Sequence, residues 1–370
     1  MKEKEKVKKS EIELPKLPGE IMEDILSRVP GKSLMRFMCV CKSWRNLFSD
    51  TRFTKMHLNR ATEICSHSPH LIFATATKLY HADLDSFDHT TSLHLPFRKR
   101  PVKNLQLVGT CNGLVCISLN SKLTYLWNPT TRDYKELPRQ IPKSRCRGWR
   151  WVYWGFGFNP ISDEYKVVRV VTFSALDKTE VHVYTLGTNS WGSVELGDIE
   201  FNIDTHGRWL QLNQSLGNRS LHWIAKKKNM AFYEANSTIL VSFDLEEEMF
   251  REILLPESAK KADVSLELSS FNGFLSIFCS SCFQSLEVWV MKDYDGQQTW
   301  ITTFSIGRFD LYVRYFKPLG FGNNGQIILT KEFEKSIYIF DPVYKRIRKL
   351  RTPGHPVNAE IDVQSLVSLS

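Results

Sequence analysis

Cysteine and histidine pairs are the residues of this chain whose spacing could bind a metal. Two residues separate Cys279 from Cys282, and two separate His67 from His70. A tetrahedral zinc site needs four ligands, but no second CxxC or HxxxH pair follows Cys282. Because the cysteine pair lies in the apolar stretch LSIFCSSCF, we interpret its members as buried structural thiols. The sequence therefore predicts no metal site and no cofactor.

Motifs for cofactor binding or nucleophilic catalysis are equally weak. Residues 320–325, GFGNNG, match the spacing GxGxxG, but a dinucleotide site needs a helix after this motif. The following residues, QIILTKEF, alternate like a strand, so we predict a turn. No GxSxG motif occurs. Catalytic triads with distant members are not visible in one sequence, but nothing here favours one, and we predict a protein that is not an enzyme.

The net charge of +9 raises the question of nucleic acid. Lysine and arginine cluster at residues 98–100, 143–150, 226–228 and 345–351. One interpretation of these clusters is nucleic-acid binding. The other is that they serve solubility, act as a weak nuclear localisation signal or bind an acidic partner surface. The clusters are scattered and no nucleic-acid-binding motif accompanies them, so we favour the second interpretation.

No run reaches the roughly 20 apolar residues of a membrane span, and the charged N-terminus has no apolar signal region. We expect a cytoplasmic or nuclear protein with no membrane partner.

The N-terminal region is predicted to be helical. Residues 1–13 form a lysine- and glutamate-rich tail, which we expect to be disordered. In residues 14–58, apolar side chains recur at helical spacing up to Pro30, Ser33 could cap a second helix, and a third contains Trp44. Three short helices bury little apolar surface. Such a unit either binds a partner with its remaining apolar face or caps the next domain, and the spacing does not decide between them.

The residue types in this region resemble the F-box motif at its usual spacing. The matching positions include Leu17, Pro18, Ile21, Ile25, Leu26, Pro30, Leu34, Val40, Cys41, Trp44 and Phe53. The resemblance implies a three-helix module that binds a Skp-type adaptor of a cullin-based ubiquitin ligase. It also implies an adaptor-binding face that includes Leu17, Pro18, Ile21, Ile25, Leu26, Leu34, Val40 and Trp44. Some of these residues must instead hold the helices together, and the sequence does not sort them.

Residues 59–370 are predicted to be β-rich and repetitive. Four stretches share one layout: LWNPTTRDYKELP, VYTLGTNSWGSVEL, SFDLEEEMFREILLP and IFDPVYKRIRKLRTP. In each, an aromatic residue is followed seven positions later by a second large residue. The pairs are Trp127 with Tyr134, Tyr184 with Trp191, Phe243 with Phe250, and Phe340 with Ile347. This spacing fits a hairpin with a four-residue loop, in which the pair faces across two strands. A fifth copy would pair Trp289 with Trp300 and contain four extra residues.

These copies, together with a fainter one, repeat along the whole region. With Tyr80, Trp127, Tyr184, Phe243, Trp289 and Phe340 as anchors, the repeat is about 50 residues long, as in kelch-type propeller blades. The kelch Gly-Gly doublet is missing. We therefore predict an all-β, kelch-like β-propeller of about six irregular blades after the small all-α domain. Five blades, seven blades or an incompletely closed array are the alternatives.

Several phrases in this region resemble, in order, the plant F-box-associated interaction domain. They are CNGLVCI, LWNPTTRDYKELP, GFGFNPISDEYKVVRV, VYTLGTNSW, SLHWIA, SFDLEEEMFREILLP and VWVMKDYDGQQTWI. With the F-box, the resemblance covers residues 14–370 and implies a substrate-recognition subunit of a Skp-cullin-F-box ubiquitin ligase. The propeller would bind a protein substrate for ubiquitination and degradation. Family members act on immune receptors or S-locus ribonucleases, and the sequence does not choose between such substrates. A non-ligase propeller with a helical cap, or a nucleic-acid-binding protein, is the alternative.

The substrate-binding residues are predicted from one unusual stretch. Residues 145–158, RCRGWRWVYWGFGF, are rich in arginine and tryptophan and precede a predicted strand. Both residue types are enriched in interface hot spots. The alternative is packing within a blade. We select Arg147, Trp149, Arg150, Trp151 and Trp154 as candidate substrate contacts.

Overall fold

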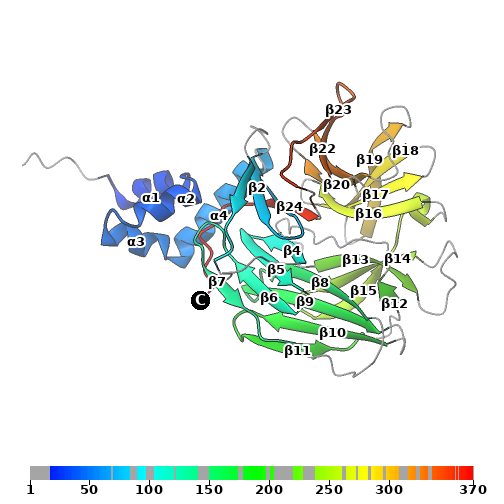
Figure 1. Cartoon of the computed structure of the whole chain (residues 1–370), viewed down its shortest axis with the longest axis horizontal. Helices are drawn as coiled ribbons and strands as arrows, with labels where there is room; N and C mark the ends of the chain where they lie inside the picture. The colour runs from blue at the N-terminus through cyan, green and yellow to red at the C-terminus, as the bar shows by residue number, and fades with distance from the viewer. Residues whose placement is uncertain are drawn as a thin grey trace, which may run out of the picture.

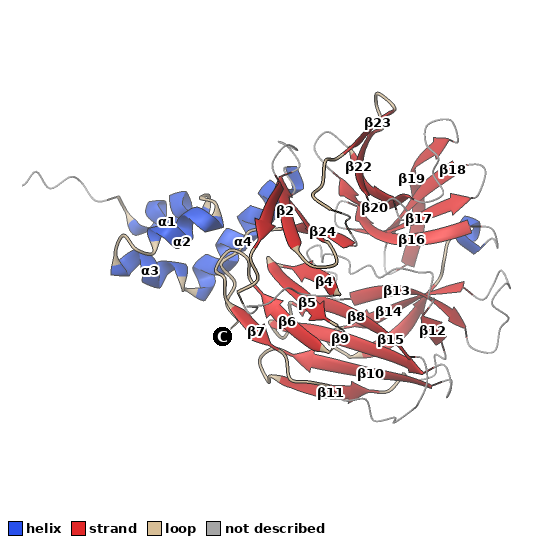
Figure 2. Ribbon diagram, in the orientation of Figure 1, coloured by secondary structure: helices blue, strands red, loops and turns tan. Residues whose placement is uncertain are grey.

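The protein has a small helical domain attached to a ring of β-sheets (Figures 1 and 2). The structure is a computed structural model. It describes residues 17–67, 70–83, 90–96, 104–120, 122–140, 150–173, 178–196, 201–203, 220–227, 238–260, 264–271, 274–281, 285–294, 297–307, 316–321, 326–331, 336–354, 356 and 358–369. Among the helices of these residues, none is long and apolar enough to cross a membrane.

The helical domain contains α1 (Gly19–Ser27), α2 (Gly31–Phe37), α3 (Lys42–Phe48) and α4 (Thr51–His67). Pro18 and Pro30 stand directly before α1 and α2, where a missing backbone N–H costs no intrahelical hydrogen bond. The prediction that Ser33 caps the second helix was wrong, because α2 begins at Gly31. The Cys41 Sγ caps α3 by accepting a hydrogen bond from the Trp44 backbone N–H at 3.4 Å.

The fourth helix was not predicted from the sequence. It spans 17 residues, and the predicted domain boundary between residues 58 and 59 falls inside it. Its start carried a usable signal, since the Asp50 carboxylate accepts a hydrogen bond from the Phe53 N–H at 3.1 Å, a typical N-cap contact. In Figure 1, α4 connects the other three helices to the sheets.

Six four-stranded antiparallel sheets form the blades of a propeller. Blades 1 to 3 are β24 (Asn358–Asp362), β1 (His70–Ala74), β2 (Leu79–Asp83), β3 (Thr90–Leu93); β4 (Leu105–Cys111), β5 (Leu114–Leu119), β6 (Leu123–Trp127), β7 (Tyr134–Glu136); and β8 (Arg150–Asn159), β9 (Glu164–Phe173), β10 (Lys178–Thr185), β11 (Ser190–Val194). Blades 4 to 6 are β12 (Phe201–Ile203), β13 (Ser220–Lys227), β14 (Thr238–Asp244), β15 (Met249–Ile253); β16 (Val264–Phe271), β17 (Phe274–Ser281), β18 (Ser285–Tyr294), β19 (Gln297–Gly307); and β20 (Phe316–Phe321), β21 (Ile327–Lys331), β22 (Ser336–Asp341), β23 (Arg346–Lys349). A short 3₁₀ helix, η2 (Glu257–Lys260), links blades 4 and 5.

The six blades and the repeat anchors confirm the predicted propeller. Each anchor, from Tyr80 to Phe340, lies on the third strand of its blade. The last strand of the chain, β24, pairs with β1, so the two ends of the β-region share blade 1 and close the ring. First strands of neighbouring blades contact one another, such as β4 with β8 and β16 with β20, and therefore surround the centre of the ring.

The predicted cross-strand pairs are confirmed in four blades. Trp127 pairs with Tyr134, Tyr184 with Trp191, Phe243 with Phe250, and Phe340 with Ile347. In blade 2 the Asn128 Oδ1 accepts hydrogen bonds from the turn N–H groups of Thr130 and Thr131, at 2.8 and 3.3 Å. The Asp244 and Asp341 carboxylates do the same in blades 4 and 6. These stretches are hairpins of the scaffold.

The fifth predicted pair was wrong. Trp289 lies opposite Thr302, and Trp300 lies opposite Met291. The four extra residues do not enlarge the loop, because pairing continues to Tyr294 opposite Gln297. A register shift between Val288 and Trp289 also moves the pairing by one residue. The insertion therefore lengthens both strands of the hairpin.

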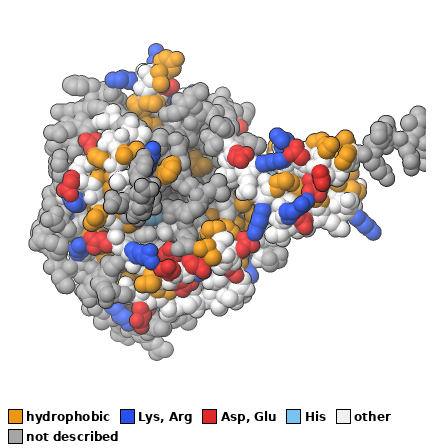
Figure 3. Space-filling view, turned by 180° about the vertical axis from the view of Figure 1, so that it is seen from behind, with side chains coloured by type: hydrophobic (Ala, Val, Ile, Leu, Met, Phe, Trp, Pro, Cys, Tyr) orange, Lys and Arg blue, Asp and Glu red, His pale blue; other side chains and the backbone are white. Residues whose placement is uncertain are grey.

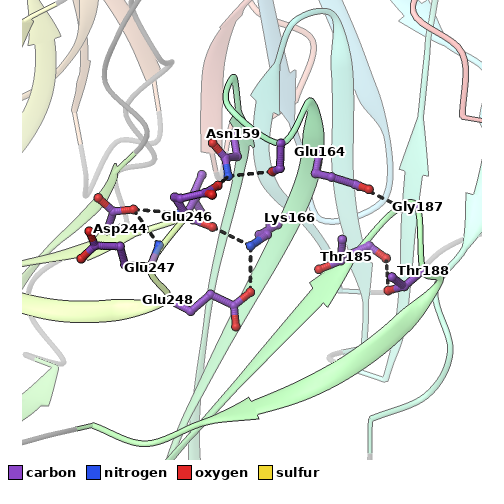
Figure 4. A network of polar contacts seen from close by, with 12 residues as sticks. Asn159, Glu164, Lys166, Thr185, Gly187, Thr188, Asp244, Glu246, Glu247 and Glu248 are labelled. Atoms are coloured by element: carbon purple, nitrogen blue, oxygen red, sulfur yellow. Dashed lines mark hydrogen bonds and ion pairs between the residues drawn. The ribbon is translucent and has the colours of Figure 1, made fainter.

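Neighbouring blades are joined by close packing and by buried polar contacts. Gly155 lies so close to blade 4 that an added Cβ would stand 2.7 Å from Leu221 Cδ1 and 3.0 Å from Trp223 Cζ2. The Lys166 ammonium donates hydrogen bonds to the Leu245 carbonyl at 2.6 Å and to Glu248 at 2.8 Å (Figure 4). These contacts join blade 3 to blade 4.

Candidate binding surfaces

The described residues of this chain contain no group of three or more histidine, cysteine or acidic side chains that could hold a metal. Cys279, one member of the CxxC pair, is a buried free thiol, and burial raises its pKa to about 12. Cys282 lies outside the described residues. Of residues 320–325, the first two end the strand β20, and the predicted turn at residues 322–325 lies outside the described residues. The strand β21 follows at Ile327, where a dinucleotide site would need a helix. The surfaces of the helices and blades are therefore the candidates for function.

Helix α1 has one apolar face inside the helical domain and another in solvent. Met22, Leu26 and Val29 point toward a core shared with α2, α3 and α4. Ile21 and Ile25, four residues apart and on one face of the helix, are 48% and 46% exposed. Large exposed apolar side chains repeated along a helix are typical of a surface that a partner covers.

The structure sorts the eight predicted adaptor contacts into three groups. Leu26 and Leu34 are 3% and 0% exposed and belong to the core, so they support the surface from beneath. Trp44 is partly buried between the rings of Phe37 and Phe48, with centroid distances of 5.7 and 6.2 Å. The others lie on the surface: Leu17, Pro18, Ile21, Ile25 and Val40. We call the exposed residues Leu17, Ile21, Ile25 and Val40 the apolar face. In Figure 3, orange side chains gather at the free end of the helices.

A charged clamp holds α1 against α4. The Arg60 guanidinium donates hydrogen bonds to the Asp24 carboxylate and to the Asp24 carbonyl, the latter at 2.7 Å. Arg52 forms an ion pair with Glu23 at 2.5 Å. Hydrogen bonds from Arg28 and Arg60 lower the pKa of Asp24. The clamp keeps α1 in an orientation that leaves Ile21 and Ile25 in solvent.

The helices contact one end of the propeller. Lys55 on α4 forms an ion pair, at 2.9 Å, with Asp163 in the turn between β8 and β9. Gly31 on α2 lies against Thr130, in the turn between β6 and β7. In an antiparallel blade, turns between strands 1 and 2 and between strands 3 and 4 lie at the same end. The helical domain is therefore at this end, and turns between strands 2 and 3 lie at the opposite end.

The described residues among the predicted substrate contacts lie toward the end of the propeller opposite the helical domain. Strand β8 runs from Arg150 to Asn159, and Asn159 leads into the turn that contains Asp163. Its ten residues span about 30 Å. Trp151, near the start of the strand, is 49% exposed. Arg147 and Trp149 lie outside the described residues, as does the side chain of Arg150.

Trp154 has a different environment from Trp151. It is 5% exposed, packs 6.3 Å from the ring of Trp191, and lies beneath the Arg169 guanidinium at 5.4 Å. These contacts favour the packing alternative for Trp154. Of the five candidate substrate contacts, Trp151 is the one with a described, exposed side chain.

A buried polar cluster near Trp154 was missed in the sequence. The Gln140 amide donates a hydrogen bond to His182 Nδ1 at 2.8 Å, which leaves the proton on His182 Nε2, 3.5 Å from Glu180. Glu180 and His182 are 8% and 1% exposed. Their alternation with valine in TEVHVY placed both on one face of a strand, and this signal could have identified them.

Comparisons with known proteins agree with both domains. The family model described as "F-box domain" matches residues 14–56, and that described as "F-box associated beta propeller domain" matches residues 61–367. The chain is 28% identical to the F-box protein CPR1 of Arabidopsis thaliana, over 95% of this chain and 88% of the relative. It is 29% identical to the Arabidopsis F-box/kelch-repeat protein At3g23880, over 88% of this chain and 87% of the relative.

Solved structures resemble the chain more distantly. A chain in a nidogen/laminin complex covers 80% of this chain and 99% of its own length, with 11% identity and a TM-score of 0.44, a likeness too low to inform function. The family models account for both the helices with the apolar face and the six blades. Because the propeller model matches well over half of the residues and the F-box model precedes it, the chain belongs to the family of F-box proteins with an F-box associated β-propeller.

Proposed function

We propose that this protein is the substrate-recognition subunit of a Skp-cullin-F-box ubiquitin ligase. The F-box helices would bind a Skp-type adaptor, which links the chain to a cullin, while the propeller binds a protein substrate. The observation that carries the proposal is the apolar face, whose four members are 46–64% exposed although a separate set of side chains fills the core beneath it. Burial of such residues stabilises a protein complex by about 25 cal/mol per Å² before association costs.

In this proposed role, the protein catalyses no reaction itself. By holding a substrate at a fixed place relative to the adaptor, it raises the local concentration of the substrate's lysines near the conjugating enzyme. We place this role in the cytoplasm or nucleus, and the free thiols of Cys111, Cys116 and Cys279 suit a reducing compartment. Immune receptors and S-locus ribonucleases stay predicted substrates from the family resemblance.

Adaptor binding is tested by placing charge in the apolar face. We expect the double variant Ile21→Asp/Ile25→Asp to weaken binding of a purified Skp-type adaptor by at least about 100-fold, because two carboxylates would be buried without partners. Isothermal titration calorimetry with the full chain measures this change. The melting temperature should stay within about 2 °C, since both side chains are about half exposed.

The matched control changes exposed apolar residues of the propeller. Leu254 and Val343 are 77% and 74% exposed, and Leu254→Asp/Val343→Asp introduces the same charge away from the helices. It should bind the adaptor like the unmodified chain. Equal adaptor binding by the Ile21/Ile25 variant and the unmodified chain would overturn the assignment. So would high-affinity, steeply salt-dependent binding of RNA or DNA without adaptor binding, which would favour a nucleic-acid-binding protein.

The substrate-binding end is tested by affinity capture from native tissue with the ligase blocked, followed by mass spectrometry. A substrate should be captured by the unmodified chain and by the Ile21→Asp/Ile25→Asp variant. Trp151→Ala should reduce its capture at least about fivefold, because the exposed indole lies at the end opposite the helices. If Trp151→Ala captures as much substrate as the unmodified chain, Trp151 does not belong to the substrate-binding surface. This result would not bear on the proposal for adaptor binding.

A further inference from the structure

Residues 363–369, which follow β24, connect the propeller to the core of the F-box. Leu366 is 6% exposed and packs in the same core as Leu26, Leu34 and Phe53. Three residues later, Leu369 packs in a different core with Leu126 of blade 2 and side chains of blade 3. The segment therefore supplies side chains to two domains, and we call residues 363–369 the strap.

A buried amide of blade 2 holds the strap in place. Asn128 is fully buried, and its Nδ2 donates hydrogen bonds to the carbonyls of Ser365 and Val367 at 3.1 and 2.9 Å. Its Oδ1 accepts the turn hydrogen bonds described above. In blades 4 and 6 the same turn position is Asp244 or Asp341, which accepts such bonds but cannot donate. The donor at residue 128 thus serves the strap rather than the turn.

A glycine in the neighbouring hairpin lets the strap approach closely. Gly113 has a φ of +78°, and an added Cβ would stand 2.5 Å from the Val363 carbonyl oxygen and 2.4 Å from Ser365 Oγ. Any other residue would be strained in this conformation and would push against the strap. Gly31 of α2 also lies close to Gln364, so the strap runs between the F-box and blade 2.

The strap comes directly after the strand that closes the ring. Strand β24 pairs with β1, and four residues after Asp362 the chain reaches Leu366 in the F-box core. Without Leu366, that core would lose one of its buried residues in a domain that is small for independent folding. Completion of the F-box core and closure of the propeller are therefore linked by a short run of residues.

We propose that the strap couples the F-box to propeller closure, with Leu366 and Asn128 as positioning residues for the apolar face. A chain whose propeller has not closed cannot place Leu366 beneath α1 and α2, so its adaptor-binding surface is loosened. The consequence for the ligase rests on the proposed function, whereas the coupling itself is a property of the chain alone. The coupling would favour the assembly of completely folded substrate receptors, rather than partly folded ones, into the ligase.

Hydrogen–deuterium exchange of the full chain without adaptor tests the coupling. We expect Leu366→Ala to accelerate amide exchange in α1 and α2 at least about tenfold, because truncation of a buried leucine opens a cavity beneath them. Leu255→Ala is the matched control, since Leu255 is also 6% exposed but packs between blades 4 and 5. It should leave exchange in α1 and α2 unchanged. Leu366→Met should largely restore protection.

Asn128→Asp tests the strap without touching the F-box core. The carboxylate keeps the turn acceptor but faces two strap carbonyls that it cannot donate to, so exchange in residues 363–369 and in α1–α2 should accelerate together. Asp341→Asn makes the reverse change in blade 6 and should alter neither region. If both Leu366→Ala and Asn128→Asp leave α1 and α2 as protected as in the unmodified chain, the coupling is wrong.

Adaptor titrations separate this inference from the proposed function. If the unmodified chain binds the adaptor, Leu366→Ala and Asn128→Asp should each weaken binding at least about threefold, although neither side chain lies on the apolar face. If the unmodified chain binds no adaptor while the exchange results hold, the proposed function fails and the coupling stands. Undiminished adaptor affinity in both variants would overturn the positioning role of Leu366 and Asn128.

Discussion

Individual buried residues couple the stability of the propeller to pH. His222, on β13, is fully buried, and burial lowers its pKa to about 4 from the ordinary value of 6.5. Burial, aided by the charge of Lys32, likewise lowers the pKa of His81 to about 4. Asp362 acts in the opposite sense, because burial raises its pKa to about 7. The pH dependence of stability is a sum of such opposed contributions, and each is separable by substitution.

We expect His222→Met to reduce acid destabilisation. An unfolded chain protonates this histidine below pH 6.5, whereas the folded chain does so only near pH 4, so stability is lost as the pH falls from 6.5 to 4. Removing the group should flatten this part of the profile by up to about 3 kcal/mol. Urea unfolding at several pH values measures it. His94→Met, at an exposed position, should keep the profile of the unmodified chain. An unchanged profile in the His222 variant would contradict the prediction.

At the scale of elements, the blades depend on hairpins and on close contacts between sheets. The hairpins were predictable because cross-strand pairing has a fixed spacing, and Trp127 with Tyr134 shows it. The fifth hairpin was not, because a register shift and longer strands break that spacing. Interblade contacts such as Gly155 against Leu221 join residues 66 positions apart, and spacing carries no information about them.

Gly155→Ala should destabilise the propeller. The added methyl group would overlap Leu221 and Trp223 of the next blade, and overpacking of this kind costs about 1–3 kcal/mol. Thermal unfolding should show a melting temperature several degrees lower. Gly192→Ala is the control, because the nearest atom to its added Cβ is 3.8 Å away. A Gly155→Ala variant as stable as the control would show that the blades can move apart without cost.

At the scale of the molecule, two domains are held in one arrangement, with candidate surfaces at opposite ends. The apolar face belongs to helices at one end of the propeller, and Trp151 lies near the start of a strand at the other end. The junction contains both an exposed ion pair, Lys55 with Asp163, and the buried strap. Exposed ion pairs contribute about 0–1 kcal/mol, whereas a buried leucine contributes several times more. The strap should therefore dominate the junction.

Asp163→Asn should leave the junction intact. Asp163 and Lys55 are about half exposed, so solvent screens their attraction, and asparagine tolerates the positive φ of 57° at this position. We expect amide exchange in α4 to change by less than about twofold, far less than after Leu366→Ala. A larger effect of Asp163→Asn than of Leu366→Ala would mean that charge, rather than apolar packing, holds the two domains together.

From residue patterns alone, the class of each domain, about six blades and four of the hairpins could be predicted. These features depend on residues close together in the chain, whose spacing follows from the geometry of helices and hairpins. The sequence also identified the F-box residues, but only the tertiary structure separated Leu26 and Leu34, which fill the core, from Ile21 and Ile25, which remain in solvent. The strap was equally hidden, because Leu366 lies more than 300 residues from the helices that it packs against. Burial depends on which distant segments meet, and that is decided when the chain folds.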